Sequence, residues 1–124
     1  MRLADNVDLK IQDYCVDGAY TTWDKYIPAH TRQTFEDYLL RGYPPGSFSN
    51  AVLTNNLYRA TSCADHANRQ VLQEICTWVL NVLPAGSFGN TMLVEAWLHD
   101  VDGRRSEFVE QVEKKIAWRK LNEI

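Results

Sequence analysis

Two Gly-Ser pairs, Gly46-Ser47 and Gly86-Ser87, stand where backbone N–H groups are free to bind an anion. Each pair follows a proline within two residues and precedes a phenylalanine. We therefore expect one helix to end, a tight turn to follow, and a new helix to begin at a capping serine. The first N–H groups of a helix and its dipole favour negative charge. If both helix starts face one cleft, the two pairs predict a site for the phosphates of a nucleotide-like ligand.

The two pairs belong to a longer repeated stretch. Residues 44–53 read Pro-Pro-Gly-Ser-Phe-Ser-Asn-Ala-Val-Leu, and residues 84–93 read Pro-Ala-Gly-Ser-Phe-Gly-Asn-Thr-Met-Leu, so six of ten positions are identical at an offset of 40 residues. Apolar residues before the turn match at the same offset, with Phe35, Tyr38, Leu39 and Leu40 in the first copy and Ile75, Trp78, Val79 and Leu80 in the second. A fixed period of this size is typical of a repeated supersecondary unit. We predict two helix–turn–helix repeats related by a pseudo-twofold axis.

The chain of 124 residues is predicted to form a single, mainly α domain. Helical spacing of apolar residues predicts helices over residues 31–41, 48–64, 69–82, 90–99 and 106–122. These helices divide the chain into an N-terminal arm, a first repeat, a second repeat and a C-terminal helix, at residues 1–27, 28–66, 67–101 and 104–124. The arm has a weak alternating pattern followed by Asp17-Gly18, which fits either a short β-hairpin or an irregular segment.

The composition excludes several classes of partner. A formal net charge of −3 argues against tight binding to nucleic acid, which needs a basic surface. Cys15, Cys63 and Cys76 form an odd set without paired spacing, as expected for free thiols in a reducing cytoplasm. No apolar run approaches the roughly 20 residues of a membrane span, and the start of the chain does not read as a signal peptide. We expect a soluble cytoplasmic protein that does not bind membranes.

The candidate ligand-binding residues are Arg32, Gly46, Ser47, Asn50, Asn55, Asn56, Gly86, Ser87 and Asn90. Arg32, and also Arg69, lie near predicted helix starts, where a guanidinium would add charge-assisted hydrogen bonds. Asn50 and Asn90 occupy the same position of the repeat, and we interpret them as braces of the helix starts. Asn55 and Asn56 interrupt an apolar stripe and either line a cleft or join a hydrogen-bond network. Capping without a ligand is the simpler interpretation of the serines.

Catalysis and metal binding lack the residue patterns that they require. Cys63 and His66 have a Cys-x-x-His spacing, but there is no second pair to complete a zinc site. Asp65-His66 and His99-Asp100 are adjacent pairs, and neighbouring side chains on a helix point apart. Ser47 does not lie in a Gly-x-Ser-x-Gly elbow. We therefore predict no catalytic residues, no metal, no cofactor and no enzymatic activity.

Two helices joined by a turn also fit a DNA-reading unit. The presumed recognition helix, residues 48–64, carries one basic residue, Arg59, which is poor equipment for contacts to phosphates or bases. A small DNA-binding or regulatory helix–turn–helix protein is therefore the alternative function.

Several motifs between Tyr26 and Trp97 resemble those of one family. They are Tyr26-Ile27-Pro28-Ala29-His30-Thr31-Arg32, Pro45-Gly46-Ser47-Phe48, Ala51-Val52-Leu53, Asn55-Asn56-Leu57, Ala64-Asp65, Asn68, Trp78, Asn81, Pro84, Gly89 and Trp97. The chain resembles a family of small proteins encoded by bacteriophages and prophages, which has no assigned enzymatic activity. The resemblance implies a viral accessory protein that counteracts or modulates a host system, by binding a host protein or sequestering a nucleotide signal.

The C-terminal helix suggests how the domain is completed. Val109, Val112 and Ile116 form a narrow apolar stripe, which suits docking either on the domain or on a second subunit. We expect a homo-oligomer.

Overall fold

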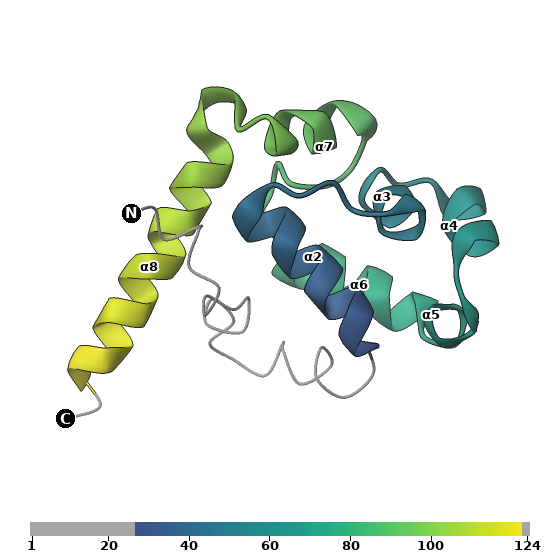
Figure 1. The fold of residues 1–124 in the computed structure, drawn as a ribbon, viewed down its shortest axis with the longest axis horizontal. Helices are drawn as coiled ribbons and strands as arrows, with labels where there is room; N and C mark the ends of the chain where they lie inside the picture. Colours follow the sequence, from purple (N-terminus) through teal and green to yellow (C-terminus); the bar gives the residue numbers. More distant parts are fainter. Residues whose placement is uncertain (1–26, 123–124) are drawn as a thin grey trace.

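The computed structural model describes residues 27–122, and the regular elements of this part of the chain are helices (Figure 1). They are α2 (Ala29–Arg41), α3 (Ser47–Leu53), α4 (Leu57–Cys63), α5 (His66–Gln70), α6 (Leu72–Val82), α7 (Thr91–Leu98), the 3-10 helix η3 (Val101–Gly103) and α8 (Arg104–Asn122). The predicted mainly α fold is confirmed for the described residues. Residues 1–26, which hold nearly all of the predicted N-terminal arm or hairpin, lie outside them.

The helix–turn–helix order occurs in both copies of the repeated stretch, as α2–α3 and as α6–α7. Matched positions are buried in both copies, with exposed fractions of 0% and 0% for Phe35 and Ile75, 0% and 2% for Tyr38 and Trp78, and 0% and 3% for Leu39 and Val79. The next pair departs from this pattern, because Leu40 is 0% exposed and Leu80 is 69% exposed. A leucine is therefore buried in the first copy of the repeat and exposed at the equivalent position of the second.

The predicted helix over residues 48–64 is wrong, because the chain breaks after Leu53 and forms two helices, α3 and α4. Asn55 has φ 63°, in the left-handed region that asparagine tolerates better than most residues. Asn56 caps α4 by accepting the N–H of Arg59 at 3.1 Å. The two asparagines that interrupt the apolar stripe therefore lie in the turn that separates α3 from α4.

The predicted helix over residues 69–82 is also divided, because Val71 ends α5 and begins α6 with φ −122° and ψ 23°. The remaining predicted helices are observed with shifted starts. The helix predicted from residue 31 begins at Ala29, the one predicted from residue 106 begins at Arg104, and α7 runs from Thr91 to Leu98.

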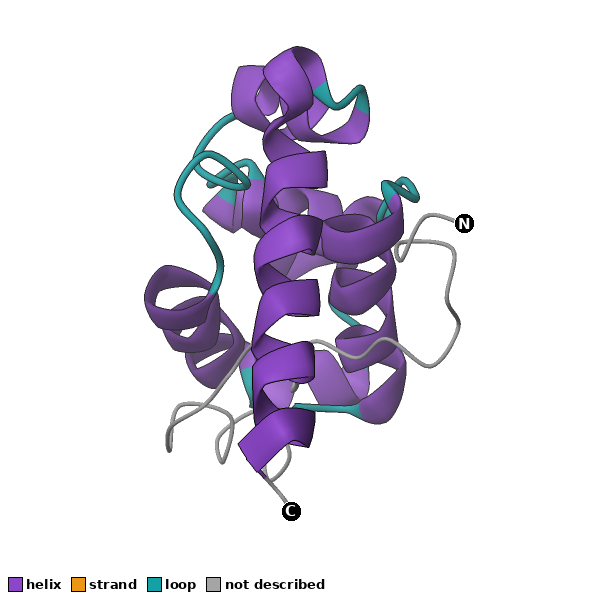
Figure 2. Ribbon diagram, turned by 90° about the vertical axis from the view of Figure 1, so that its left-hand side faces the viewer, coloured by secondary structure: helices purple, strands orange, loops and turns teal. Residues whose placement is uncertain are grey.

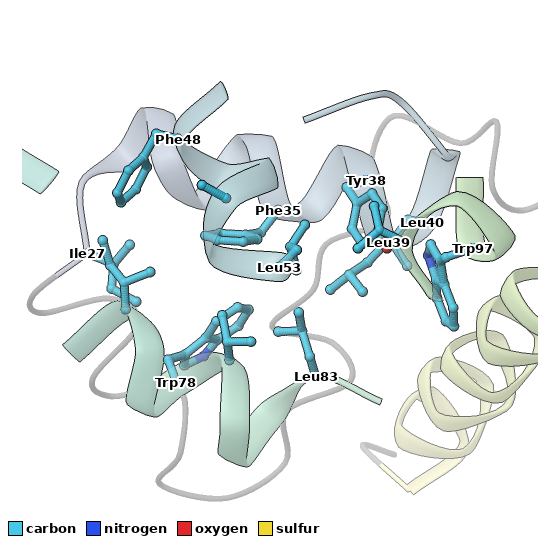
Figure 3. Packing of buried hydrophobic residues seen from close by; sticks show 14 of the residues in the cluster. Ile27, Phe35, Tyr38, Leu39, Leu40, Phe48, Leu53, Trp78, Leu83 and Trp97 are labelled. Atoms are coloured by element: carbon cyan, nitrogen blue, oxygen red, sulfur yellow. The ribbon is translucent and has the colours of Figure 1, made fainter. Parts of the chain in front are cut away.

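Two groups of aromatic rings connect α2 with other helices in the core, and Figure 3 labels Phe35, Trp78, Tyr38 and Trp97 among them. The ring centroids of Phe35 on α2 and Trp78 on α6 lie 5.9 Å apart. Tyr38 on α2 lies 6.4 Å from Trp97 on α7, and Trp97 lies 5.7 Å from Phe108 on α8. Helix α2 therefore lies at the centre of the packing, and its buried face holds both copies of the repeat together.

Helix α8 runs along one side of the helical body (Figure 2) and is held there at its first turn. Arg105 donates through Nε to the carbonyl of Trp97 at 3.1 Å and through Nη2 to that of Leu98 at 3.4 Å. Asp100 accepts the N–H groups of Arg105 and Ser106 at 2.9 and 3.0 Å and the Ser106 hydroxyl. These bonds satisfy backbone carbonyls at the end of α7 and backbone N–H groups at the start of α8, which have no partner within their own helices.

Asp100 makes the stability of the fold depend on pH. Burial acts to raise the pKa of this carboxyl, but hydrogen bonds from Ser106 and the charge of Arg105 outweigh it and hold the pKa below the ordinary 3.8. A depressed folded-state pKa contributes stability that is present above the unfolded pKa and is lost as pH falls through the folded one. We therefore expect the free energy of unfolding to decrease as the pH falls from neutral to below about 4, where the Asp100 carboxyl becomes protonated.

Urea unfolding of the wild type and of Asp100→Asn across this pH range checks the prediction. The variant keeps an oxygen that accepts the N–H groups but has no charge, so its free energy of unfolding should change less with pH in this range. Parallel pH curves for the two proteins would contradict the role of the Asp100 carboxylate.

Candidate functional site

The first Gly-Ser pair lies at a helix start, but its serine is not the cap. Helix α3 begins at Ser47, the N-cap position is taken by Gly46, and no side chain caps this end. The helix has seven residues, so its dipole is that of a short helix. Ser47 itself is exposed. The prediction that Ser47 caps this helix is therefore wrong.

The second Gly-Ser pair does not begin a helix, which corrects the prediction for Gly86 and Ser87. Ser87 is 0% exposed, and its hydroxyl donates to the carbonyl of Pro84 at 2.7 Å. Its own carbonyl accepts the Tyr38 hydroxyl at 2.6 Å. Since Ser47 is exposed and Ser87 is buried, the two serines do not face solvent in a common cleft.

The asparagines of the repeat have different roles in the two copies. Asn90 caps α7 by accepting the N–H of Leu93 at 2.8 Å, as predicted for a brace of a helix start. Asn50, its equivalent, lies within α3 and is half-buried, and its carbonyl accepts the Thr54 hydroxyl at 2.8 Å. Asn56 is a cap, as described above. Among the predicted ligand-binding asparagines, Asn55 is the one that lines the pocket described below.

The two predicted phosphate-binding arginines, Arg32 and Arg69, differ in their exposure to solvent. Arg69 donates through Nη2 to the carbonyl of Ala64 at 3.3 Å, so its guanidinium closes the turn between α4 and α5. Arg32 lies near the start of α2 and is half-buried. The contact of Arg69 is therefore to the backbone of a turn, and it gives no support to a phosphate site at this residue.

A polar clamp of four residues, His30, Thr31, Asp65 and Asn68, joins the start of α2 to α5. Nε2 of His30 lies 3.0 Å from Oδ2 of Asp65. Oδ1 of Asp65 accepts the N–H of Asn68 at 2.8 Å, and the Thr31 hydroxyl donates to Oδ1 of Asn68 at 2.5 Å. The N–H of Asn68 is the main cause that lowers the pKa of Asp65, followed among the lowering causes by His30. The carboxylate therefore stays ionised near neutral pH.

Sequence reasoning missed the His30–Asp65 pair, because its members are 35 residues apart and neither belongs to a motif. It brings an imidazole and a carboxylate within hydrogen-bond distance, which the sequence neighbours Asp65-His66 and His99-Asp100 were not expected to do. It lies at the surface, with side chains 60% and 54% exposed, so bulk water screens it. Across residues 27–122, no three His, Cys, Asp or Glu side chains converge on a metal-sized site.

A pocket of about 210 Å³ lies between α3, α6 and the loop before α7, and we call it the α3–α6 pocket. Its lining residues are Val52, Leu53, Asn55, Cys76, Val79, Leu80, Phe88 and Gly89. The backbone closes it at one point, where the N–H of Gly89 donates to the carbonyl of Leu53 at 2.7 Å. The two copies of the repeated stretch therefore meet at this pocket.

The α3–α6 pocket is apolar and uncharged. Among its lining residues only Asn55 and Cys76 have polar side chains, and none is Lys, Arg, Asp or Glu. Burial raises the pKa of the half-buried Cys76 thiol, so the group is neutral near pH 7. Leu80 is both a lining residue and 69% exposed, which places it at the rim. The pocket suits an apolar group and offers one amide for a hydrogen bond.

One of the predicted site residues, Asn55, lines the pocket. The other predicted residues are not among its lining residues: Arg32, Gly46, Ser47, Asn50, Asn56, Gly86, Ser87 and Asn90. A polar residue inside an apolar stripe was the signal that identified Asn55. The exposure of Leu80 has no such signal, since its type and spacing match those of buried Leu40.

Comparison of the chain with protein-family models, with curated proteins and with solved structures gives no match. The resemblance to phage-encoded proteins therefore stays a prediction. Within the described residues, no helix combines the length and the apolar character that crossing a bilayer requires.

Proposed function

We propose that this protein is a non-enzymatic accessory protein of phage origin that acts in the host cytoplasm by binding a host protein, and that the α3–α6 pocket receives an apolar side chain of that partner. The single observation that carries the proposal is the uncharged, apolar lining of the pocket with Leu80 exposed at its rim. Interfaces often place one partner's apolar anchor in a pocket of the other. The phage origin is supported by the motif resemblance between Tyr26 and Trp97.

The size and charge of the pocket favour a protein side chain over a nucleotide. Pockets for small molecules usually have volumes of about 300–1,000 Å³, whereas this one has about 210 Å³. A nucleotide phosphate also needs cationic or N–H donors, and no Lys or Arg lines this pocket. The volume is sufficient for one large aliphatic or aromatic side chain.

The alternative of DNA binding has little support from the helices that would read DNA. Helix α3, Ser47–Leu53, contains no Lys or Arg, and α4 contributes Arg59 as its one basic residue. A recognition helix must contact phosphates and base edges, which such a surface does poorly.

Affinity capture with the variant Leu80→Asp tests the proposed function. Wild-type protein should retain a host protein that the variant loses, because the aspartate places a charge at the apolar rim. Met92→Asp is the matched control, since Met92 is 80% exposed and does not line the pocket. The captured protein is then purified, and calorimetry of the binary mixture should show that Leu80→Asp weakens binding by at least about tenfold, because no cationic side chain lines the pocket to pair with the aspartate.

Three further measurements complete the test. An occupied pocket should shield the Cys76 thiol from alkylation and leave exposed Cys63 reactive. Thermal shift against mono-, di- and cyclic nucleotides should show no stabilisation, because ligands that bind the native state raise its melting temperature. A rise in melting temperature that Ser47→Ala or Arg32→Ala removes would contradict the proposal and favour a nucleotide signal.

Light scattering of the same samples tests the expected homo-oligomer.

A further inference from the structure

The surface around the α3–α6 pocket is poor in charge. Residues 42–64, which include α3 and α4, contain one charged residue, Arg59, and residues 83–90 contain none, although 23% of the whole chain is charged. The centres of protein interfaces are depleted of charge and enriched in tyrosine and arginine. The two segments therefore have the composition of the centre of a protein interface, with Arg59 as their one charged residue.

The start of α4 carries large side chains that are exposed to solvent. We call Leu57, Tyr58 and Arg59 the α4 tip; Leu57 is 64% exposed, Tyr58 is 89% exposed, and Arg59 is also exposed. Ala60 and Ala64 are buried beside them, so α4 packs on the body through alanines and leaves its larger side chains outside. Two exposed large side chains in succession form an apolar surface that a partner can cover.

The α4 tip begins close to the pocket, because two residues of chain span at most about 7 Å. Asn55 lines the pocket and lies two residues before Leu57, and Asn56 between them holds the turn by capping α4. The capping bond ends on the N–H of Arg59, so the backbone at the tip is fixed relative to the pocket. Within the described residues, no ion pair involves the Arg59 guanidinium.

We propose that the α4 tip and the α3–α6 pocket form one docking surface for a protein segment that carries an apolar side chain for the pocket and a nearby carboxylate for Arg59. The proposal rests on the proposed function and adds the chemistry of the partner. The guanidinium fork of arginine matches a carboxylate in two parallel hydrogen bonds. A partner that covers the exposed Leu57 and Tyr58 side chains would exclude water from this part of the surface, which strengthens such a pair.

Selection of a random displayed peptide library on the purified protein tests the inference. We expect enriched peptides with one large apolar residue and an Asp or Glu at a constant distance from it. Binding of one such peptide, measured by fluorescence anisotropy, should weaken about tenfold with Arg59→Glu, as for loss of an interface charge pair. A peptide with lysine in place of its acidic residue should bind Arg59→Glu better than the wild type.

Lys114→Glu is the matched control, because it makes the same change in net charge at an exposed position of α8. It should leave the affinity within about twofold. If Arg59→Glu and Lys114→Glu lower the peptide affinity equally, the effect depends on net charge alone, and the inference is overturned. Enriched peptides without acidic residues, or no enrichment, would also overturn it. If Leu80→Asp abolishes peptide binding and Arg59→Glu has no effect, the pocket proposal stands and the docking surface at the α4 tip fails.

Discussion

Leu40→Ala will lower the free energy of unfolding by about 2–5 kcal/mol, the range for removing a large aliphatic side chain from a packed core. Leu40 is 0% exposed near the end of α2, in the cluster that includes Tyr38 and Trp97 (Figure 3). Its removal loses burial energy and leaves a cavity that rigid aromatic neighbours fill poorly. Guanidinium unfolding followed by circular dichroism measures the loss.

Leu80→Ala is the matched control for Leu40→Ala. It makes the same chemical change within α6, at the equivalent position of the repeated sequence, but at a side chain that is 69% exposed. We expect its free energy of unfolding to change by less than about 0.5 kcal/mol. Similar losses for the two variants would show that the environments of the two leucines do not differ as described.

Gly42→Ala will destabilise the fold by about 3 kcal/mol, through backbone strain and a steric collision. Gly42 ends α2 with φ 70°, and its N–H donates to the carbonyl of Tyr38 at 3.2 Å. A Cβ atom there would lie 2.6 Å from Cζ of Arg105. The guanidinium cannot move away without weakening its bonds to the carbonyls at the end of α7, described above.

Gly103→Ala separates the two causes, because Gly103 also has φ 70° but has no atom within 4 Å of an added Cβ. Its loss should be about 1–2 kcal/mol, from backbone strain alone. In the background of Arg105→Ala, Gly42→Ala should cost no more than Gly103→Ala does. Chemical unfolding of the five proteins, with the wild type included, closes the cycle. An unchanged cost of Gly42→Ala in that background would exclude the collision with Arg105.

Helix content and the buried face of α2 could be predicted from sequence, because both follow from local spacing. The apolar side chains of Phe35, Tyr38 and Leu39 recur at helical spacing, and this spacing alone predicts a buried face. Capping residues also act within one turn, so Asn90 was identified as a brace from its position. The break at Asn55 was visible as polar residues inside an apolar stripe, although one helix was predicted there.

The candidate site could not be predicted in the same way. Its lining residues come from three segments, and contact between Leu53 and Gly89 depends on how α3 and the loop before α7 pack, which no local pattern encodes. The clamp between His30 and Asp65 depends likewise on the packing of α2 against α5. Side chains far apart in sequence meet only when burial of apolar surface brings their helices together.

The sequence by itself determined a mainly helical chain with two similar helix–turn–helix units and an uncharged stretch around each turn. Only the tertiary structure decided that the two units have different surroundings. Ser47 is exposed and Ser87 is buried, and Leu40 lies in the core while Leu80 lies at the rim of a pocket. The physical reason is that helix formation depends on residues within a few positions of each other, whereas exposure depends on which other helices cover a face.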